Sequence, residues 1–111
     1  RRDRLLVQRV RELLRARPAG LHTGELIAKE LHVSPRTLHR QLQEEGASLQ
    51  VLKNEIRRDR AVELLNKTSK PIKQIALAVG FLNEKSFSRA FKQWTGATPE
   101  SFREKGQHFA S

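Results

Sequence analysis

Apolar residues recur three or four positions apart along almost the whole chain, which is the period of an amphipathic helix. The first such stretch runs through Arg17 and stops at Pro18. Its apolar residues are Leu6, Val10, Leu13 and Leu14. Apolar and polar residues do not alternate with a period of two over a useful length. The pattern therefore predicts an all-α chain without a sheet.

Capping residues predict where the next helices begin. Thr23 is expected to cap a second helix that ends near Leu31. Ser34 is expected to cap a third, with Pro35 at its first position, where a missing N–H costs nothing. Gly46 ends that helix, and Ser48 caps a fourth, the longest, over residues 48–66. The apolar residues expected on its packed side are Leu49, Leu52, Ile56, Leu64 and Leu65.

Three further helices complete the predicted set of seven. After a short linker at residues 68–71, a fifth helix is expected over residues 72–79 and a sixth over residues 84–95 behind an Asn83 cap. Thr98 and Pro99 predict a short seventh helix around Phe102. Residues 107–111 are expected to form a loose tail.

A near-repeat organises these helices. Ile27 to Gln43 is written again, in altered residues, from Ile75 to Lys92. The matched positions are Ile27, Ala28, Leu31, Leu38, Arg40 and Leu42 in the first copy and Ile75, Ala76, Val79, Phe87, Arg89 and Phe91 in the second. Each copy has the outline of a helix-turn-helix. We therefore predict two helix-turn-helix lobes joined by the long central helix.

Charge and composition narrow the function. The chain has 22 Lys and Arg against 12 Asp and Glu, a net charge of +10 and a pI near 11.1, so it should attract anions. Nucleic acid is the first candidate partner and an anionic membrane surface the second. No apolar run is long enough to span a bilayer. There is no cysteine, and the four histidines lack metal-ligand spacing, so neither metal nor cofactor is expected.

An enzyme is not expected, because no nucleophile-base pair, phosphate-binding glycine loop or acid dyad can be found at a readable spacing. A basic interaction module that binds RNA or an anionic surface is the alternative to DNA binding. That alternative accounts for the charge but not for two helix-turn-helix outlines.

Helical geometry separates an inner and an outer face in each second helix of the repeat. Inward residues are Leu38 and Leu42 in the first copy and Phe87, Phe91 and Trp94 in the second. Outward or edge residues are Arg36, Thr37, His39, Arg40 and Gln43 in the first and Lys85, Ser86, Ser88, Arg89 and Lys92 in the second. A basic outer face is usually only a solvated one. Two matched copies in a strongly basic chain favour contact with DNA.

The same residues carry a resemblance. The second half of the chain is similar to the C-terminal signature of the AraC/XylS family of bacterial transcription regulators. The residues that match are Ile75-Ala76, Val79-Gly80-Phe81, Ser86 to Lys92, Gly96, Thr98-Pro99 and Phe102-Arg103. Leu31 to Leu42 with Gly46 resembles that family's first helix-turn-helix. The resemblance extends from Asp3 to Arg103. It implies a seven-helix DNA-binding domain over residues 1–111, with lobes at 3–47 and 71–105 and a connecting helix at 48–66.

The resemblance also implies which residues contact DNA. Base-reading positions fall on Arg36, His39, Arg40, Glu84, Lys85, Ser86 and Arg89. Glu84 is the weakest of these, because the helical wheel turns it toward the packed side. It could accept a hydrogen bond from cytosine N4 or only complement the helix dipole. The candidates for phosphate contacts are chosen for their charge, polarity and position and not from the resemblance, and the cations among them could instead be only solvated. They are Thr37, Gln43, Lys53, Arg57, Arg58, Lys73, Ser88 and Lys92.

One departure concerns the first turn, where His32 occupies the position of Gly80 in the second. If that turn requires a positive φ, His32 is strained and Gly80 is not.

The expected partner is double-stranded DNA with an asymmetric, two-part site, because the outward residues of the two copies differ. A connecting helix of about 18 residues spans roughly 27 Å, whereas one turn of B-DNA spans about 34 Å. Two reading helices held at this spacing would enter adjacent major grooves on one side of the duplex, or bend the DNA to do so. The resemblance further favours an activator that contacts RNA polymerase over a simple repressor, a choice that the sequence leaves open, in the bacterial cytoplasm at the nucleoid. It places an effector or dimerisation domain before Arg1 in the full-length protein.

Overall fold

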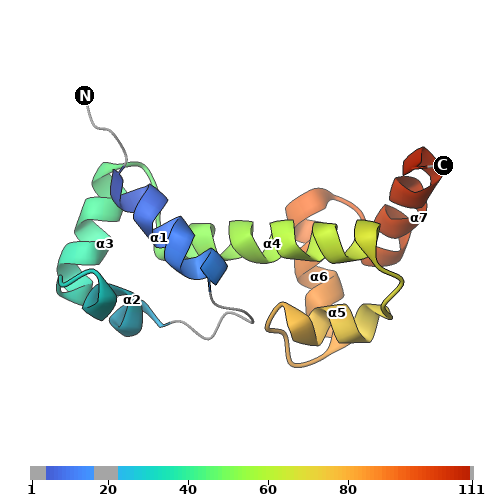
Figure 1. Ribbon diagram of the computed structural model, residues 1–111, viewed down its shortest axis with the longest axis horizontal. Coiled ribbons are helices and arrows are strands. Elements are labelled where there is room, and N and C mark those ends of the chain that lie inside the picture. Colours follow the sequence, from blue (N-terminus) through green and yellow to red (C-terminus); the bar gives the residue numbers. More distant parts are fainter. Residues whose placement is uncertain (1–4, 17–22, 111) are drawn as a thin grey trace. The chain divides into compact units, whose positions relative to one another are not determined.

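All regular secondary structure in the residues that the structure describes is helical. This computed structural model describes residues 5–16 and 23–110, and side chains as far as residue 105. Its helices are α1 (Leu5–Ala16), α2 (Gly24–Glu30), α3 (Pro35–Glu44), α4 (Leu49–Lys67), α5 (Ile72–Ala78), α6 (Glu84–Thr95) and α7 (Pro99–Ala110) (Figure 1). The predicted all-α fold of seven helices is confirmed.

The helices form two compact units, which comprise residues 1–56 and 57–111. Each unit has its own hydrophobic core, and α4 contributes to both. Its first half supplies Leu52 and Ile56 to the core of unit 1, and its second half supplies Ala61 and Leu65 to the core of unit 2. Each helix-turn-helix therefore packs against its own section of α4.

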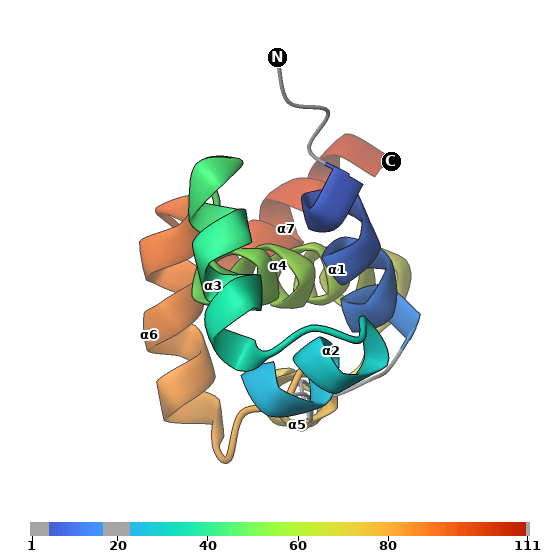
Figure 2. The same ribbon diagram turned by 90° about the vertical axis from the view of Figure 1, so that its left-hand side faces the viewer.

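Unit 1 packs α1, α2 and α3 around the first half of α4 (Figure 2). Two polar contacts fix α1 in addition to its apolar face. Glu45 accepts a hydrogen bond from the backbone N–H of Val7 at 3.0 Å, where a carboxylate also complements the positive end of the helix dipole. Arg11 forms a two-pronged ion pair with Glu55 of α4, at 2.9 and 3.1 Å. Unit 1 is therefore held by both apolar and charged contacts.

Unit 2 has an aromatic core. Phe87 and Phe91 on α6 are fully buried, and Phe102 of α7 meets Phe91 edge-on at 5.3 Å. Arg103 donates to the backbone carbonyls of Leu65 and Thr68, both at 3.2 Å, at the carboxyl end of α4. Those carbonyls have no partner within the helix, so a cation there satisfies them and complements the negative end of the dipole.

The predicted helix starts are confirmed by their cap hydrogen bonds. The side chain of Asn83 accepts from the N–H of Ser86 at 2.8 Å, and Ser34 accepts from Thr37 at 3.0 Å. Three further caps accept a backbone N–H on their side-chain hydroxyl in the same way. They are Thr23 from Leu26, Ser48 from Val51 and Thr98 from Ser101. These local signals act within one turn, which is why sequence alone identified them.

The carboxyl-terminal tail differs from expectation. The seventh helix is not short but continues from Pro99 to Ala110, so residues 107–110, expected as a loose tail, are helical. No proline follows Pro99 in the sequence to end the helix, and Gly106, a residue type that often follows a helix end, lies inside α7. Ser111 and the stop signal at Pro18 lie outside the described residues.

Both helix-turn-helix turns contain a residue with a positive φ. His32 has a φ of 61° and Gly80 a φ of 97°, each two residues past the end of its helix. The N–H of His32 donates to the Lys29 carbonyl and that of Gly80 to the Leu77 carbonyl, both at 3.1 Å. The first turn therefore places a side chain in a conformation that favours glycine.

Replacing His32 with glycine should stabilise the chain. The left-handed conformation destabilises the folded state by about 1–2 kcal/mol for a non-glycine residue. Glycine removes this strain, but it loses more conformational entropy on folding, which offsets about 0.5–1 kcal/mol of the gain. We expect His32→Gly to raise the free energy of unfolding by about 0.5–1 kcal/mol in urea titrations. Gly80→His is the reciprocal control and should lower that free energy. If His32→Gly destabilised the chain, strain at this turn would be ruled out.

Candidate functional site

The outward face of α3 gathers five of the predicted residues. Leu38 and Leu42 are 2% and 0% exposed, so they fix the inner side of the helix. The remaining positions follow from that rotation. Arg36, His39, Arg40 and Gln43 are exposed, and Thr37 is half-buried. Thr37 also contacts the cap, because its hydroxyl accepts from Ser34 Oγ at 2.9 Å.

The outward face of α6 has the same construction. Phe87 and Phe91 are both 0% exposed, which turns the opposite side to solvent. The residues exposed there are Glu84, Lys85, Ser86, Arg89 and Lys92, and Ser88 is half-buried. Trp94 is half-buried against the core, as expected of a packing residue. Within each unit, the central predicted residue, Arg40 or Arg89, therefore lies on the side opposite the buried pair.

The position of Glu84 corrects an expectation. The helical wheel turned it toward the packed side, but its side chain is exposed. Glu84 is the first residue of α6, next to the Asn83 cap, so no further helical turn lies over it. The carboxylate is thus free to complement the helix dipole and to meet a ligand.

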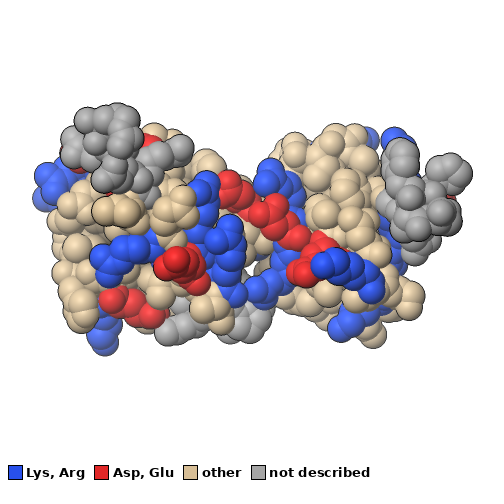
Figure 3. All heavy atoms as spheres, turned by 45° about the horizontal axis from the view of Figure 1, so that its top comes forward, with Lys and Arg blue, Asp and Glu red and all other residues tan. Residues whose placement is uncertain are grey.

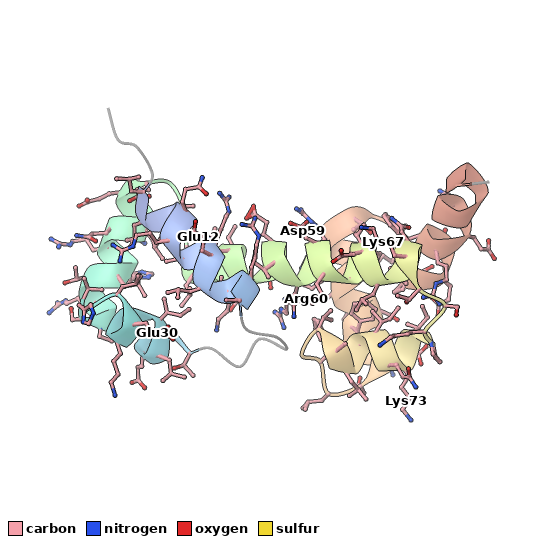
Figure 4. The ribbon with its side chains drawn as sticks, viewed as in Figure 1. Glu12, Glu30, Asp59, Arg60, Lys67 and Lys73 are labelled. Atoms are coloured by element: carbon pink, nitrogen blue, oxygen red, sulfur yellow. The ribbon has the colours of Figure 1, made fainter. Side chains whose placement is uncertain are left out.

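The candidate phosphate contacts outside the two reading helices have different surroundings. Lys73 on α5 is exposed and extends away from the helix (Figure 4). Lys53 on α4 is half-buried. Arg58 donates to the carboxylate of its neighbour Asp59, at 3.1 Å, with 41% of its side chain exposed. Lys73 therefore has the freest access to a ligand among these three.

Positive charge does not cover every face of the chain. Figure 3 shows a face on which acidic and basic side chains are interspersed on both units. Acidic residues on α4 include Asp59 and Glu63, of which Glu63 pairs with Lys67 at 3.5 Å. By contrast, the exposed side of α3 presents Arg36 and Arg40. The outward face of α3 therefore offers two exposed cations to an anion.

Arg57 has surroundings that sequence reasoning missed. Its guanidinium lies over the Phe81 ring at 4.7 Å and near the Trp94 ring at 5.8 Å. Removal from water lowers the pKa of this guanidinium from its ordinary value. Phe81 lies in the turn between α5 and α6, three residues before Glu84, so Arg57 supports the turn that leads into α6. The half-buried position favours a structural role over a phosphate contact.

The described residues hold no group of three or more His, Asp or Glu that could bind a metal ion. Among them, no helix combines the length and the apolar character needed to cross a membrane.

Comparisons with known proteins show which family the sequence resembles. A family described as "Helix-turn-helix domain" matches residues 27–105. The ornithine utilization regulator of Pseudomonas aeruginosa is 41% identical over 99 residues, which cover 89% of this chain and 29% of that protein. The first curated relatives are matched over only 23% to 31% of their own length.

Solved structures share the fold over nearly the whole chain. A DNA-binding transcriptional dual regulator from Escherichia coli K-12 gives a TM-score of 0.88 at 30% identity, covering 93% of both chains. A transcriptional regulator from Chromobacterium violaceum, described as of the AraC-type DNA-binding domain-containing proteins, gives 0.84 at 31% identity and covers 91% of both.

Removing the cation of Arg57 should loosen unit 2. We expect Arg57→Met to lower the free energy of unfolding by about 0.5–2 kcal/mol, the range of a partly desolvated cation–π contact. Trp94 is the only tryptophan, so its fluorescence should also change. Arg58→Met is the matched control and should cost less, because an exposed ion pair contributes about 0–1 kcal/mol. Equal losses would mean that stacking adds nothing.

Proposed function

Because the chain belongs to the AraC-type helix-turn-helix family of transcriptional regulators, we propose that it binds double-stranded DNA in a sequence-specific manner and regulates transcription. One observation carries this proposal. Arg40 and Arg89 occupy matching exposed positions on α3 and α6, each opposite a pair of buried residues. Two helices of this kind in a strongly basic chain fit the major groove better than any other anionic surface.

Arginine suits these central positions chemically. Its planar fork can donate two hydrogen bonds to O6 and N7 of a guanine. We propose that base contacts come from Arg36, His39, Arg40, Glu84, Lys85, Ser86 and Arg89. Phosphate contacts would come from Thr37, Gln43, Lys53, Arg58, Lys73, Ser88 and Lys92, with Arg57 acting chiefly in support.

We propose that residues 1–111 act as one DNA-binding domain, with the reading helices in adjacent major grooves of an asymmetric, two-part site. The difference between the two outward faces supports the asymmetry. Arg36, Thr37 and Gln43 of the first correspond to Lys85, Ser86 and Lys92 of the second. Two faces that offer different donors read different bases.

The wider role is also a proposal, since the chain spans less than a third of its first curated relatives. We propose that the full-length protein carries an additional effector or dimerisation domain. In the full-length protein, the DNA-binding domain of residues 1–111 would bring the protein to promoters in the bacterial nucleoid. There we propose that the protein acts as an activator in contact with RNA polymerase. Membership of a family of transcriptional regulators supports this role.

Arg40→Ala and Arg89→Ala should each relax specificity at one base pair. Loss of a two-pronged guanine contact costs about 1–3 kcal/mol, and that cost should appear on a selected duplex but not on random DNA. Arg9→Ala on α1 removes the same charge from an exposed arginine and is the matched control. Gel-shift titrations on both duplexes make the measurement. Equal losses on selected and random DNA would remove Arg40 and Arg89 from base reading.

Binding should weaken steeply as salt rises from 50 to 200 mM. Each neutralised phosphate releases counterions, so six to ten such contacts imply a loss of about 10³- to 10⁵-fold. Lys73→Ala should reduce the slope of log affinity against log salt by about one. Competition with RNA and anionic vesicles serves as control. Salt-independent binding, or preference for either competitor, would favour the basic interaction module over DNA recognition.

A further inference from the structure

Leu82 is the most exposed large apolar residue in the described part of the chain. Its side chain is 92% exposed. The next values are 65% for Leu5, 59% for Val51, 51% for Leu77 and 45% for Leu26. Leu82 lies in the turn between α5 and α6, immediately before the Asn83 cap of the reading helix.

Leu82 has no counterpart in the first lobe. Between α2 and α3 the turn comprises residues 31–34, and between α5 and α6 it comprises residues 79–83. The repeat is offset by 48 positions before the turn, from Ile27 to Ile75, and by 49 after it, from Leu38 to Phe87. Because Val33 matches Phe81 and the cap Ser34 matches Asn83, the extra residue is Leu82.

Phe81, and not Leu82, makes the apolar contact that usually comes from the residue before a helix cap. An apolar residue directly before a helix cap normally packs against the fourth helical residue and fixes the entry of the chain. In the first lobe Val33 occupies that position and packs against the core that contains Leu38. In the second, Phe81 meets Phe87 edge-on at 5.6 Å from one residue further back. Leu82 is thus left in solvent while the entry is already fixed.

Leu82 is the exposed apolar residue at an end of α6 where the other exposed side chains are polar or charged. The side chain of Asn83 is used by the cap, since it accepts from the Ser86 N–H at 2.8 Å. Lys85, three residues after Leu82, is exposed on the reading side. The amino-terminal end of a recognition helix is the end that reaches base edges. Leu82 directly precedes the cap of α6, so this exposed apolar residue is at the end of the helix that is proposed to meet base edges.

We propose that Leu82 is a specificity-determining residue that contacts the C5 methyl group of a thymine at the edge of the site read by α6. This rests on the proposed DNA binding. A leucine side chain has no hydrogen-bond donor for a phosphate, and the thymine methyl is the apolar group that base pairs present in the major groove. The contact gives the second lobe a preference that the shorter turn of the first lobe lacks.

The test combines a protein change with removal of that methyl group. A duplex is first selected from a random library with the unchanged chain. Each thymine in it is then replaced, one at a time, by deoxyuridine, which lacks the C5 methyl. We expect one replacement near the α6 half-site to weaken binding about three- to tenfold, the effect of one buried methyl group. With Leu82→Ser, the same replacement should have no effect.

Leu77→Ser is the matched control, because it removes an exposed leucine of the same lobe from α5. It should leave the deoxyuridine effect unchanged. Thermal unfolding of each variant separates binding from folding, and Leu82→Ser should unfold like the unchanged chain, since Leu82 packs against little.

Each outcome decides the proposal. An equal deoxyuridine effect in the unchanged chain and in Leu82→Ser overturns the thymine contact while DNA binding stands. A loss in Leu82→Ser that is equal on selected and random DNA assigns Leu82 to the sugar-phosphate backbone and also overturns it. If the unchanged chain selects no duplex, the proposed function fails and this inference fails with it.

Discussion

The burial of two residues one helical turn apart, on α3 and again on α6, is the constraint on which the candidate interface depends. Leu38 and Leu42, like Phe87 and Phe91, are almost completely removed from water. Burying such a pair contributes several kcal/mol, far more than any surface charge. The apolar pair therefore sets the rotation of the helix, and Arg40 or Arg89 is exposed as a consequence.

Each unit has a small core, so contacts other than apolar burial also stabilise the orientation of α3 and of α6. These contacts differ between the two units. Unit 1 adds charged contacts, with Arg11 paired to Glu55 and Glu45 on the amino end of α1. Unit 2 relies on larger rings and on Arg57, whose cation covers an aromatic surface that would otherwise meet water. Different contacts thus stabilise the units that contain α3 and α6. A substitution tolerated in one unit need not be tolerated in the other.

The sequence predicted what depends on neighbours within one or two turns. Caps such as Asn83 and the inward faces of α3 and α6 follow from local rules, whereas the positive φ at His32 was only a condition that the structure met. Contacts between distant residues did not follow. Nothing near Arg57 in sequence indicates Phe81, and nothing near Arg103 indicates Leu65. Glu84 was misplaced because a helical wheel ignores helix ends, where no further turn covers the first residue.

Under the proposed function, the two outward faces divide specificity unequally. The first offers Arg36 and Arg40, two rigid forks whose donors match guanine in direction as well as charge. At the position of Arg36, the second offers Lys85, a point charge on a flexible stem that discriminates less between acceptors. A lobe with one fewer fork needs another source of selectivity or contributes mainly affinity. The additional turn residue Leu82 lies in that lobe, where an apolar contact would supply the selectivity that the lysine does not.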